Sequence, residues 1–143
     1  MVDDEIKFLK SISERLALKN FDVITASNGE EAIASAEKDL FDVAVVDFKM
    51  PGMDGTQVLK VLKERHKHLE IIMLTGHATI DSAIECTKLG AFKYLEKPYN
   101  FEKLVAAIKE AYEARLKKKF EHNKEHMEKI EKLSFRESPL GLL

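Results

Sequence analysis

Short apolar runs alternate along the chain with segments in which apolar residues recur every three or four positions. Val43 to Val46 and Ile71 to Leu74 are continuous apolar runs, typical of parallel strands buried on both faces. Phe21 to Ala26 alternates in part, and Ala91 to Leu95 forms a further short run. The pattern therefore predicts strands in all four places.

Segments of helical spacing lie between these runs, and residues that begin or end helices mark their limits. Asn20 is placed to end the first helix, Asp54 to cap the third, and Gly90 to end the fourth. The predicted helices cover Ile6 to Leu18, Glu30 to Lys38, a segment after Asp54, about Ile80 to Leu89, and a segment from about Phe101. Strand and helix alternate, so we predict an α/β fold with a doubly wound parallel sheet.

Size and charge narrow the class of protein. The 143 residues fit one domain, 45% of them are hydrophobic, and the formal net charge of −2 gives no global attraction to nucleic acid or an anionic membrane. No apolar stretch approaches the roughly 18 residues of a membrane span. Met1 to Glu5 is acidic where a signal peptide is basic. We therefore expect a soluble cytoplasmic protein without direct nucleic acid or membrane partners.

Cysteine and histidine offer little chemistry. Cys86 is the single cysteine, so neither an intrachain disulfide nor a cysteine metal cage can form, and its helical context favours a buried, inert thiol. His122 and His126 have a spacing usable for zinc, but no third ligand accompanies them, so solvent exposure is favoured. His66, His68 and His77 give no stronger indication of a metal site.

Polar residues with phosphoryl chemistry follow the predicted strands. Asp47 ends an apolar run and opens a turn-rich loop, Thr75 follows the next run, and Lys97 follows the last. In open α/β sheets the carboxyl ends of the strands form the crevice where ligands bind. A carboxylate can accept a phosphoryl group, a lysine and a hydroxyl can hold its oxygens, and Asp3 with Asp4 can hold Mg²⁺ to reduce the repulsion.

Each of these residues also has an ordinary structural interpretation. Asp47 alone can be a helix cap or turn residue, Thr75 a local hydrogen bonder, and Lys97 part of a solvated loop. Asp3 and Asp4 can be the favourable negative charge at the start of the first helix. Chance is a poor explanation for all four at successive strand ends.

The ordered motifs resemble the receiver domain of two-component response regulators, closest to receivers attached to transcriptional activators. The resemblance implies a flavodoxin-like fold with strand order 2-1-3-4-5. It covers about Val2 to Tyr112 and rests on Val2 to Glu5, Val45 to Asp47 with Met50 to Gly55, Leu74 to Ala78, and Gly90 to Tyr99.

This resemblance implies a role for each site residue. Asp47 would be the phosphoacceptor for a histidine kinase, and Lys97 would contact the phosphoryl group. Asp4 would bind Mg²⁺ directly with Asp3 as its acidic partner, and Asp47 and the main-chain carbonyl of Lys49 would complete the protein ligands. Magnesium-assisted self-dephosphorylation is implied as well.

The resemblance also implies a switch. Thr75 would shift toward the phosphoryl group while Tyr94 changes rotamer, which alters the surface of the fourth helix, fifth strand and fifth helix. The peptide bond between Lys97 and Pro98 is expected to be cis.

The first strand departs from the receiver pattern. Receivers usually carry four or five apolar residues before the acidic pair, whereas here Met1 and Val2 alone precede Asp3. We expect this loss to leave the neighbouring strands without partners and to leave a hole in the core. Three explanations are open: a translation start placed too late, pairing with another chain, or a strand supplied by the chain's own tail.

The last helix is expected to continue past the domain. We place a receiver domain at residues 1–112 and a helical extension or linker at residues 113–143, broken by Ser138 to Leu143. Its apolar residues favour either a solvated helix or a dimerising one, so a homodimer can form through this helix or through the switch face. These apolar residues are Leu116, Phe120, Met127, Ile130 and Leu133.

Three functions compete. The first is a phosphorylation-dependent signalling switch that is not otherwise an enzyme. The second is a receiver-like binding module that does not respond to phosphate, because its first strand and acidic pocket are compromised. The third is an aspartate-nucleophile phosphatase, but such enzymes place two aspartates two apart, and here Phe48 and Lys49 follow Asp47. No helix-turn-helix or Walker loop is present, so these residues encode neither DNA binding nor ATPase activity.

Overall fold

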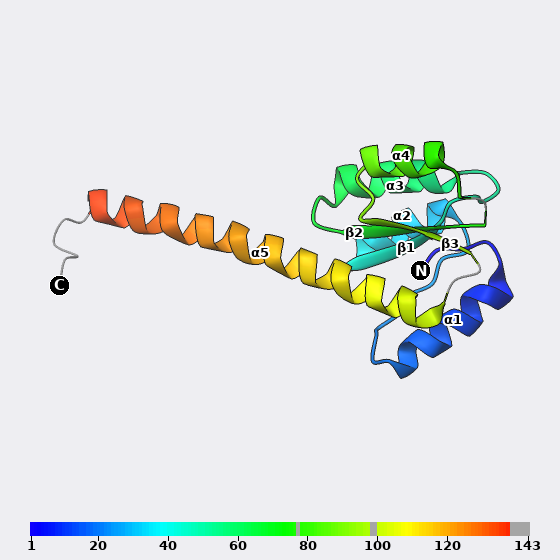
Figure 1. Ribbon diagram of the computed structural model, residues 1–143. Helices are drawn as coiled ribbons and strands as arrows, with labels where there is room; N and C mark the ends of the chain where they lie inside the picture. The colour runs from blue at the N-terminus through cyan, green and yellow to red at the C-terminus, as the bar shows by residue number, and fades with distance from the viewer. Residues whose placement is uncertain (77, 98–99, 138–143) are drawn as a thin grey trace.

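The computed structural model describes residues 1–76, 78–97 and 100–137. Within these ranges the chain alternates helices with short parallel strands (Figure 1). The elements are α1 (Ile6–Leu18), α2 (Gly29–Lys38), β1 (Val43–Asp47), α3 (Gly55–Arg65), β2 (Glu70–Thr75), α4 (Ile80–Lys88), β3 (Lys93–Glu96) and α5 (Phe101–Glu137).

The strands form a parallel sheet in the order β1-β2-β3, with β2 buried along its whole length. Helices cover both faces, with α2, α3 and α4 on one side and α1 and α5 on the other (Figure 1). Burial on both sides explains why the β2 sequence Glu70–Thr75 is almost continuously apolar. The predicted fold class, a flavodoxin-like doubly wound sheet, is confirmed.

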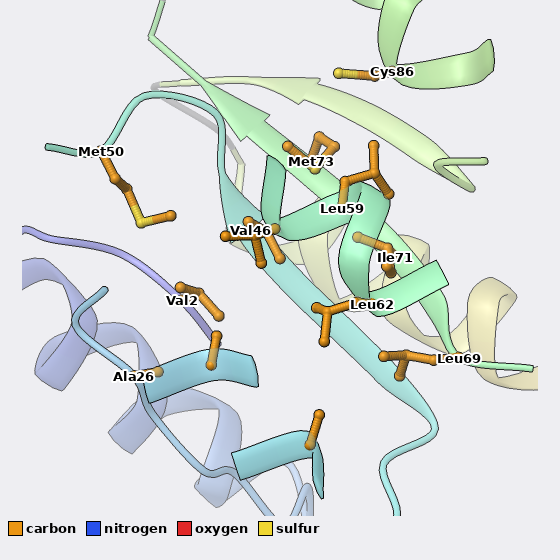
Figure 2. Close-up of a cluster of buried hydrophobic side chains, with 13 residues drawn as sticks. Val2, Ala26, Val46, Met50, Leu59, Leu62, Leu69, Ile71, Met73 and Cys86 are labelled. Atoms are coloured by element: carbon orange, nitrogen blue, oxygen red, sulfur yellow. The ribbon is translucent and has the colours of Figure 1, made fainter. Parts of the chain in front are cut away.

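Helix α3 packs its apolar face directly on the sheet. Val58 and Leu59 are completely buried, and Leu62 is nearly so. Figure 2 shows this cluster, in which Leu59 and Leu62 lie over Val46, Ile71 and Met73. The helix thereby shields β1 and β2 from water along the face that leads toward Asp47.

The predicted helix limits agree with the backbone. The Asp54 side chain accepts a hydrogen bond from the Gln57 amide at 3.0 Å and completes a capping box at the start of α3. The Asn28 side chain caps α2 by accepting a hydrogen bond from the Glu31 amide at 2.9 Å. Asn20, after α1, has φ 67°, and Gly90, after α4, has φ 99°. Both residues tolerate this left-handed backbone, which ends a helix.

Val2 occupies the position of the central strand. It forms parallel bridges with Ala26 on one side and Val46 on the other. Its amide donates to the Val45 carbonyl at 2.7 Å, and its own carbonyl accepts from the Asp47 amide at 2.9 Å. Ala26, Val2, β1, β2 and β3 therefore follow the predicted order 2-1-3-4-5, with the first strand reduced to its last residues.

The strand predicted from Phe21 to Ala26 is largely wrong. Its bridging is confined to Ala26, and residues 21–25 belong to no strand. A strand forms only beside a partner strand. The segment Met1 to Asp3 pairs with this stretch only as far as Ile24, whose carbonyl accepts a 2.7 Å hydrogen bond from the terminal nitrogen of Met1. The shortened first strand therefore leaves residues 21–25 without a strand partner, as expected.

Helix α5 continues well beyond the sheet as one helix to Glu137 (Figure 1). Arg115 pairs with Asp42 at 2.8 Å, and Lys118 pairs with the buried Glu70 at 2.6 Å, which fixes the middle of the helix at the amino ends of β1 and β2. Beyond these pairs Phe120 and Met127 are exposed. The described residues contain no helix that is both long and apolar enough to cross a membrane.

Gly55 lets the start of α3 approach the end of β1. Its amide donates to the Phe48 carbonyl at 2.9 Å. A Cβ at this position would meet the Asp47 carbonyl and would lie 2.7 Å from the Phe48 Cα, both of them backbone atoms that cannot yield. The glycine therefore holds the loop after Asp47 against α3.

Gly55→Ala should lower the free energy of unfolding by about 2 kcal/mol or more, because overpacking against backbone forces β1 and α3 apart. Gly76→Ala is the matched control, since a Cβ there meets no atom within 4 Å. Chemical denaturation of both variants measures the difference. Equal stabilities would contradict the assigned role of Gly55.

Candidate functional site

The site lies at the carboxyl edge of the sheet. Asp47 is the last residue of β1 and pairs with Leu74, so Thr75 at the end of β2 stands one position further along. Thr75 pairs with Glu96, and its carbonyl accepts a hydrogen bond from the Lys97 amide at 2.6 Å. Parallel pairing thus brings Asp47, Thr75 and Lys97 to one edge, as the sequence predicted.

Three carboxylates gather at this edge. Oxygen atoms of Asp3, Asp4 and Asp47 all lie within 4.8 Å of one another. Asp3 is fully buried, Asp47 nearly so, and Asp4 is exposed. One Asp3 oxygen accepts from the Glu5 amide at 2.9 Å, which orients this carboxylate at the start of α1. The turn from Val2 into α1 therefore places the acidic pair beside Asp47.

This donor set fits a hard divalent cation. Mg²⁺ takes oxygen ligands at about 2.1 Å, so ligands on opposite sides of one ion lie roughly 4.2 Å apart. The carboxylate oxygens of Asp3, Asp4 and Asp47 approach that spacing, and the exposed Asp4 leaves the cluster open to water. The arrangement supplies negative charge that a bound cation would neutralise.

Lys97 is the cation inside the cluster. Its ammonium lies 2.7 Å from an Asp3 oxygen and 3.6 Å from an Asp47 oxygen, and its side chain is 16% exposed. It also lies over the ring of Phe8, 4.4 Å from the centroid. Burial lowers the pKa of Lys97, but the hydrogen bond and charge of Asp3, with the charge of Asp47, outweigh burial and raise it. Lys97 therefore stays charged.

The acidity of Asp47 is weakened by its surroundings. Burial, followed by the negative charge of Asp3, raises the pKa of Asp47 to about 6, against an opposing effect of Lys97. The charge of Asp4 adds to the rise. Lys97 alone therefore does not compensate the three carboxylates, and a further positive charge at this edge would favour ionised Asp47.

Tyr94 connects this edge to α4. Its hydroxyl lies 2.6 Å from the Ser82 hydroxyl, and its ring meets the ring of Phe48 edge to face at 6.3 Å. Ser82 also forms the capping box of α4 with Thr79, whose side chain accepts from the Ser82 amide at 3.0 Å. The tyrosine predicted as half of a switch is thereby tied to the first turn of α4.

Two residues that contact the site, Ser82 and Phe8, were not predicted from the sequence. Ser82 was identifiable as the third residue after Thr79, a capping-box spacing, but its contact with Tyr94 depends on how α4 lies on the sheet. Phe8 reads as part of the apolar pattern of α1, and nothing in its spacing indicates that it underlies Lys97.

Other predictions have mixed outcomes. The carbonyl of Lys49, two residues past Asp47, stays a predicted ligand. Cys86 is completely buried, and burial, with the charge of Glu85, raises the pKa of its thiol to about 11, as expected of an inert cysteine. His122 and His126 are exposed as predicted. The predicted cis bond before Pro98, and the residues His77, Tyr99 and Ser138 to Leu143, lie outside the described residues.

Comparison with known proteins gives a consistent result. The family model of the response regulator receiver domain matches residues 1–109. The DNA-binding transcriptional regulator NtrC of Salmonella typhimurium is 36% identical over 111 residues, 78% of this chain and 24% of that protein. A putative NtrX-like response regulator of Rickettsia bellii is 34% identical over 115 residues, 79% of this chain and again 24% of the relative. The chain thus spans about a quarter of the length of these curated relatives.

Solved structures agree. The CheY-like receiver domain protein from Methanospirillum hungatei JF-1 superposes with a TM-score of 0.79 and 31% identity, covering 82% of this chain and 94% of that one. The beryllofluoride-activated NtrC4 receiver domain dimer gives a TM-score of 0.75 and 34% identity, covering 80% of this chain and 94% of that one.

The raised pKa of Asp47 predicts a pH-dependent stability. A carboxyl group whose pKa is higher folded than unfolded stabilises the fold below about pH 4, and this contribution is lost as the pH rises through about 6. In metal-free buffer Asp47→Asn should therefore gain about 2 to 3 kcal/mol over the parent between pH 4 and pH 7.5. Urea denaturation at both pH values measures the gain. Asp39→Asn, at an exposed position, is the control, and a gain independent of pH would contradict the assignment.

Proposed function

Because this chain belongs to the response regulator receiver domain family, we propose that it is a signalling switch that accepts a phosphoryl group on Asp47. The observation that carries the proposal is the cluster of Asp3, Asp4 and Asp47 at the carboxyl edge of the sheet, with the ammonium of Lys97 beside Asp3 and Asp47. A structural ion pair would need one carboxylate for this lysine, whereas the site holds three. The surplus negative charge favours binding of a divalent cation. The positive charge of that cation would in turn favour the approach of an anionic phosphoryl group to Asp47.

The reaction is a displacement at phosphorus. An Asp47 oxygen forms a bond to the phosphorus of a phosphohistidine in a histidine kinase, the phosphorus–nitrogen bond breaks, and the imidazole leaves with the bonding electron pair and takes up a proton. A bound Mg²⁺ supplies positive charge that offsets the repulsion between the carboxylate and the phosphoryl oxygens. Asp3, Asp4 and Asp47 would hold that ion, with the main-chain carbonyl of Lys49 as a further ligand.

Lys97 and Thr75 act on the phosphoryl oxygens. Lys97 already lies 3.6 Å from an Asp47 oxygen, so its ammonium can donate to a group bound there. Thr75 is buried at the end of the neighbouring strand, and its hydroxyl can bond a second phosphoryl oxygen. Water reaching the loaded Asp47 through the exposed side near Asp4 would hydrolyse the acyl phosphate and reset the switch.

The signal leaves through Tyr94. When the hydroxyl of Thr75 turns toward the phosphoryl group, the space beside it changes, and the ring of Tyr94 moves with it. That movement breaks or lengthens the 2.6 Å contact with Ser82 and perturbs the first turn of α4. The surface of α4, β3 and α5, which includes the exposed Ile80 and Ile84, then changes its affinity for a partner.

Partners and limits of the domain belong to the same proposal. The switch unit comprises residues 1–112, and the rest of α5 links it to an output or to a second copy of the chain. The exposed Leu116, Phe120 and Met127 are available for such a homodimer. The relatives named above include DNA-binding regulators, so we propose that the response is read by a transcriptional output.

A phosphate-independent binding module is the second candidate. The short first strand is its motivation, because the loss of that strand would leave Asp3 and Asp4 without an anchor. The bonds of Val2 to Val45 and Asp47, and of Asp3 to Ala26, argue against this concern. A phosphatase has less support, since it needs a second acid two residues after Asp47, where Lys49 stands.

Incubation of the parent with acetyl phosphate and Mg²⁺ should add the mass of one phosphoryl group, and Asp47→Asn should abolish the gain. Lys97→Gln should slow loading by about tenfold or more, because it removes a charged donor to the phosphoryl oxygens. Intact-protein mass spectrometry follows both. Asp54→Asn is the matched control, because asparagine preserves the cap of α3 in the same loop.

Equal loading of the parent and Asp47→Asn would refute the switch. Absence of loading in both, with equal Mg²⁺ affinity, would favour the binding module. Steady release of phosphate from a phosphate ester would favour the phosphatase.

The switch predicts a change at one tyrosine. In protein labelled with 3-fluorotyrosine, beryllofluoride and Mg²⁺ should shift the ¹⁹F resonance that Tyr94→Phe removes. Thr75→Ala should abolish the shift, whereas Thr87→Ala, which alters an exposed hydroxyl of α4 bonded to Ala83, should leave it. A shift that survives Thr75→Ala would separate Tyr94 from the phosphorylation site.

A further inference from the structure

The histidine pair of α5 lies beside a third histidine in the folded chain. His122 and His126 are four residues apart, so they lie one turn apart on one face of the helix. The ring of His122 lies near the ring of His68, with 6.0 Å between the centroids and 51° between the planes. His68 belongs to the segment that joins α3 to β2, far from α5 in the sequence. The fold therefore supplies the third imidazole that the sequence pattern of α5 lacks.

The distance between the two rings suits a shared metal ion. Zn²⁺ binds imidazole nitrogen at about 2.0 Å, so the ion lies roughly 3.2 Å from the ring centroid, and two rings at a tetrahedral angle have centroids roughly 5.2 Å apart. The observed 6.0 Å is within about 1 Å of that value. His68, His122 and His126 are all exposed, so rotation of their side chains can close the difference without repacking a core. Two histidines four apart on a helix are also a spacing that zinc sites use.

The backbone on both sides of His68 is held in place. The ammonium of Lys63, on α3, donates to the carbonyl of Lys67 at 3.2 Å and to that of Leu69 at 3.0 Å. The Leu69 amide donates to the His66 carbonyl at 3.1 Å. A ligand on a backbone that is already fixed loses little conformational freedom when it binds an ion. The segment therefore presents His68 to α5 from a fixed position.

An ion pair aligns α5 with His68. The Lys118 ammonium, one turn before His122, lies 2.6 Å from an oxygen of the buried Glu70, which follows His68 by two residues. The pair of Lys118 with Glu70 and the pair of His122 with His68 thus join the same two segments of the chain. Because Glu70 neutralises Lys118, this ammonium also repels a cation at the histidines less than a free lysine would.

We propose that His68, His122 and His126 form a Zn²⁺ site, with water in the fourth position, that fastens α5 to the segment before β2. Imidazole nitrogen suits zinc, whereas Mg²⁺ takes oxygen ligands. The site therefore differs in chemistry from the carboxylate cluster at the carboxyl edge of the sheet. An ion bound there joins the exposed part of α5, beyond Lys118, to the body of the domain.

Isothermal titration calorimetry of the full chain with Zn²⁺, in excess Mg²⁺ to occupy the carboxylate cluster, measures the site. The chain should bind one Zn²⁺ that depends on the three histidines. His68→Gln, His122→Gln and His126→Gln should each weaken its affinity by about tenfold or more, because each removes a ligand. His66→Gln is the matched control, since that ring lies in the same segment but its Nε2 atom is 3.6 Å from Glu37 of α2. It should leave the affinity unchanged.

Amide hydrogen exchange tests whether the ion joins the two segments. Zn²⁺ should slow exchange in α5 from Lys118 to His126 in the parent and should fail to do so in His68→Gln. Zinc affinity that is unchanged in His68→Gln would overturn the site, because the helix pair alone would then account for binding. One ion bound per two chains, with a dimer in analytical ultracentrifugation, would overturn the assignment of all three ligands to one chain. None of these measurements depends on phosphorylation of Asp47, so the proposed function and the zinc site can fail separately.

Discussion

Two backbone hydrogen bonds through Val2 hold the site together. They join its amide to the Val45 carbonyl and its carbonyl to the Asp47 amide. Because Asp3 follows directly, this short ladder fixes a buried carboxylate against Lys97 and against the end of β1. Without it, Asp3 and Asp4 would belong to a free terminus, and Asp47 would be a single acid at a strand end.

The site is built from opposing electrostatic effects. Three carboxylates in a small, partly buried volume repel one another, and Lys97 relieves part of that repulsion through its contact with Asp3. The fold tolerates the remainder because Asp3 is also bonded by the Glu5 amide and because Asp4 reaches water. A site with this residual imbalance is suited to chemistry, since the proposed cation binding and phosphorylation would both change its net charge and thereby the stability of one local arrangement over another.

The strands, the helix limits and the common edge of the site residues could be predicted from the sequence, because each depends on residues close together in the chain. Continuous apolar runs specified β1 and β2, and Asp54 and Gly90 marked the helix limits. Parallel pairing then required Asp47, Thr75 and Lys97 to share an edge.

What could not be predicted depends on contacts between elements. The contact of Tyr94 with Ser82 requires the position of α4 on the sheet, and the ring of Phe8 beneath Lys97 requires the rotation of α1. The strand assigned to Phe21 through Ala26 failed for a related reason, because strand formation belongs to a pair of segments rather than to one.

Helix α5 has a mechanical consequence. Its 37 residues give a rod about 55 Å long, and the pairs of Arg115 with Asp42 and Lys118 with Glu70 grip it near the middle. A rigid helix attached to the sheet near its middle acts as a lever arm. A reorientation of about 5° at the sheet would move the far end of the helix by roughly 2 to 3 Å. A small rotation where the helix is held would therefore become, at its far end, a displacement close to the length of a hydrogen bond.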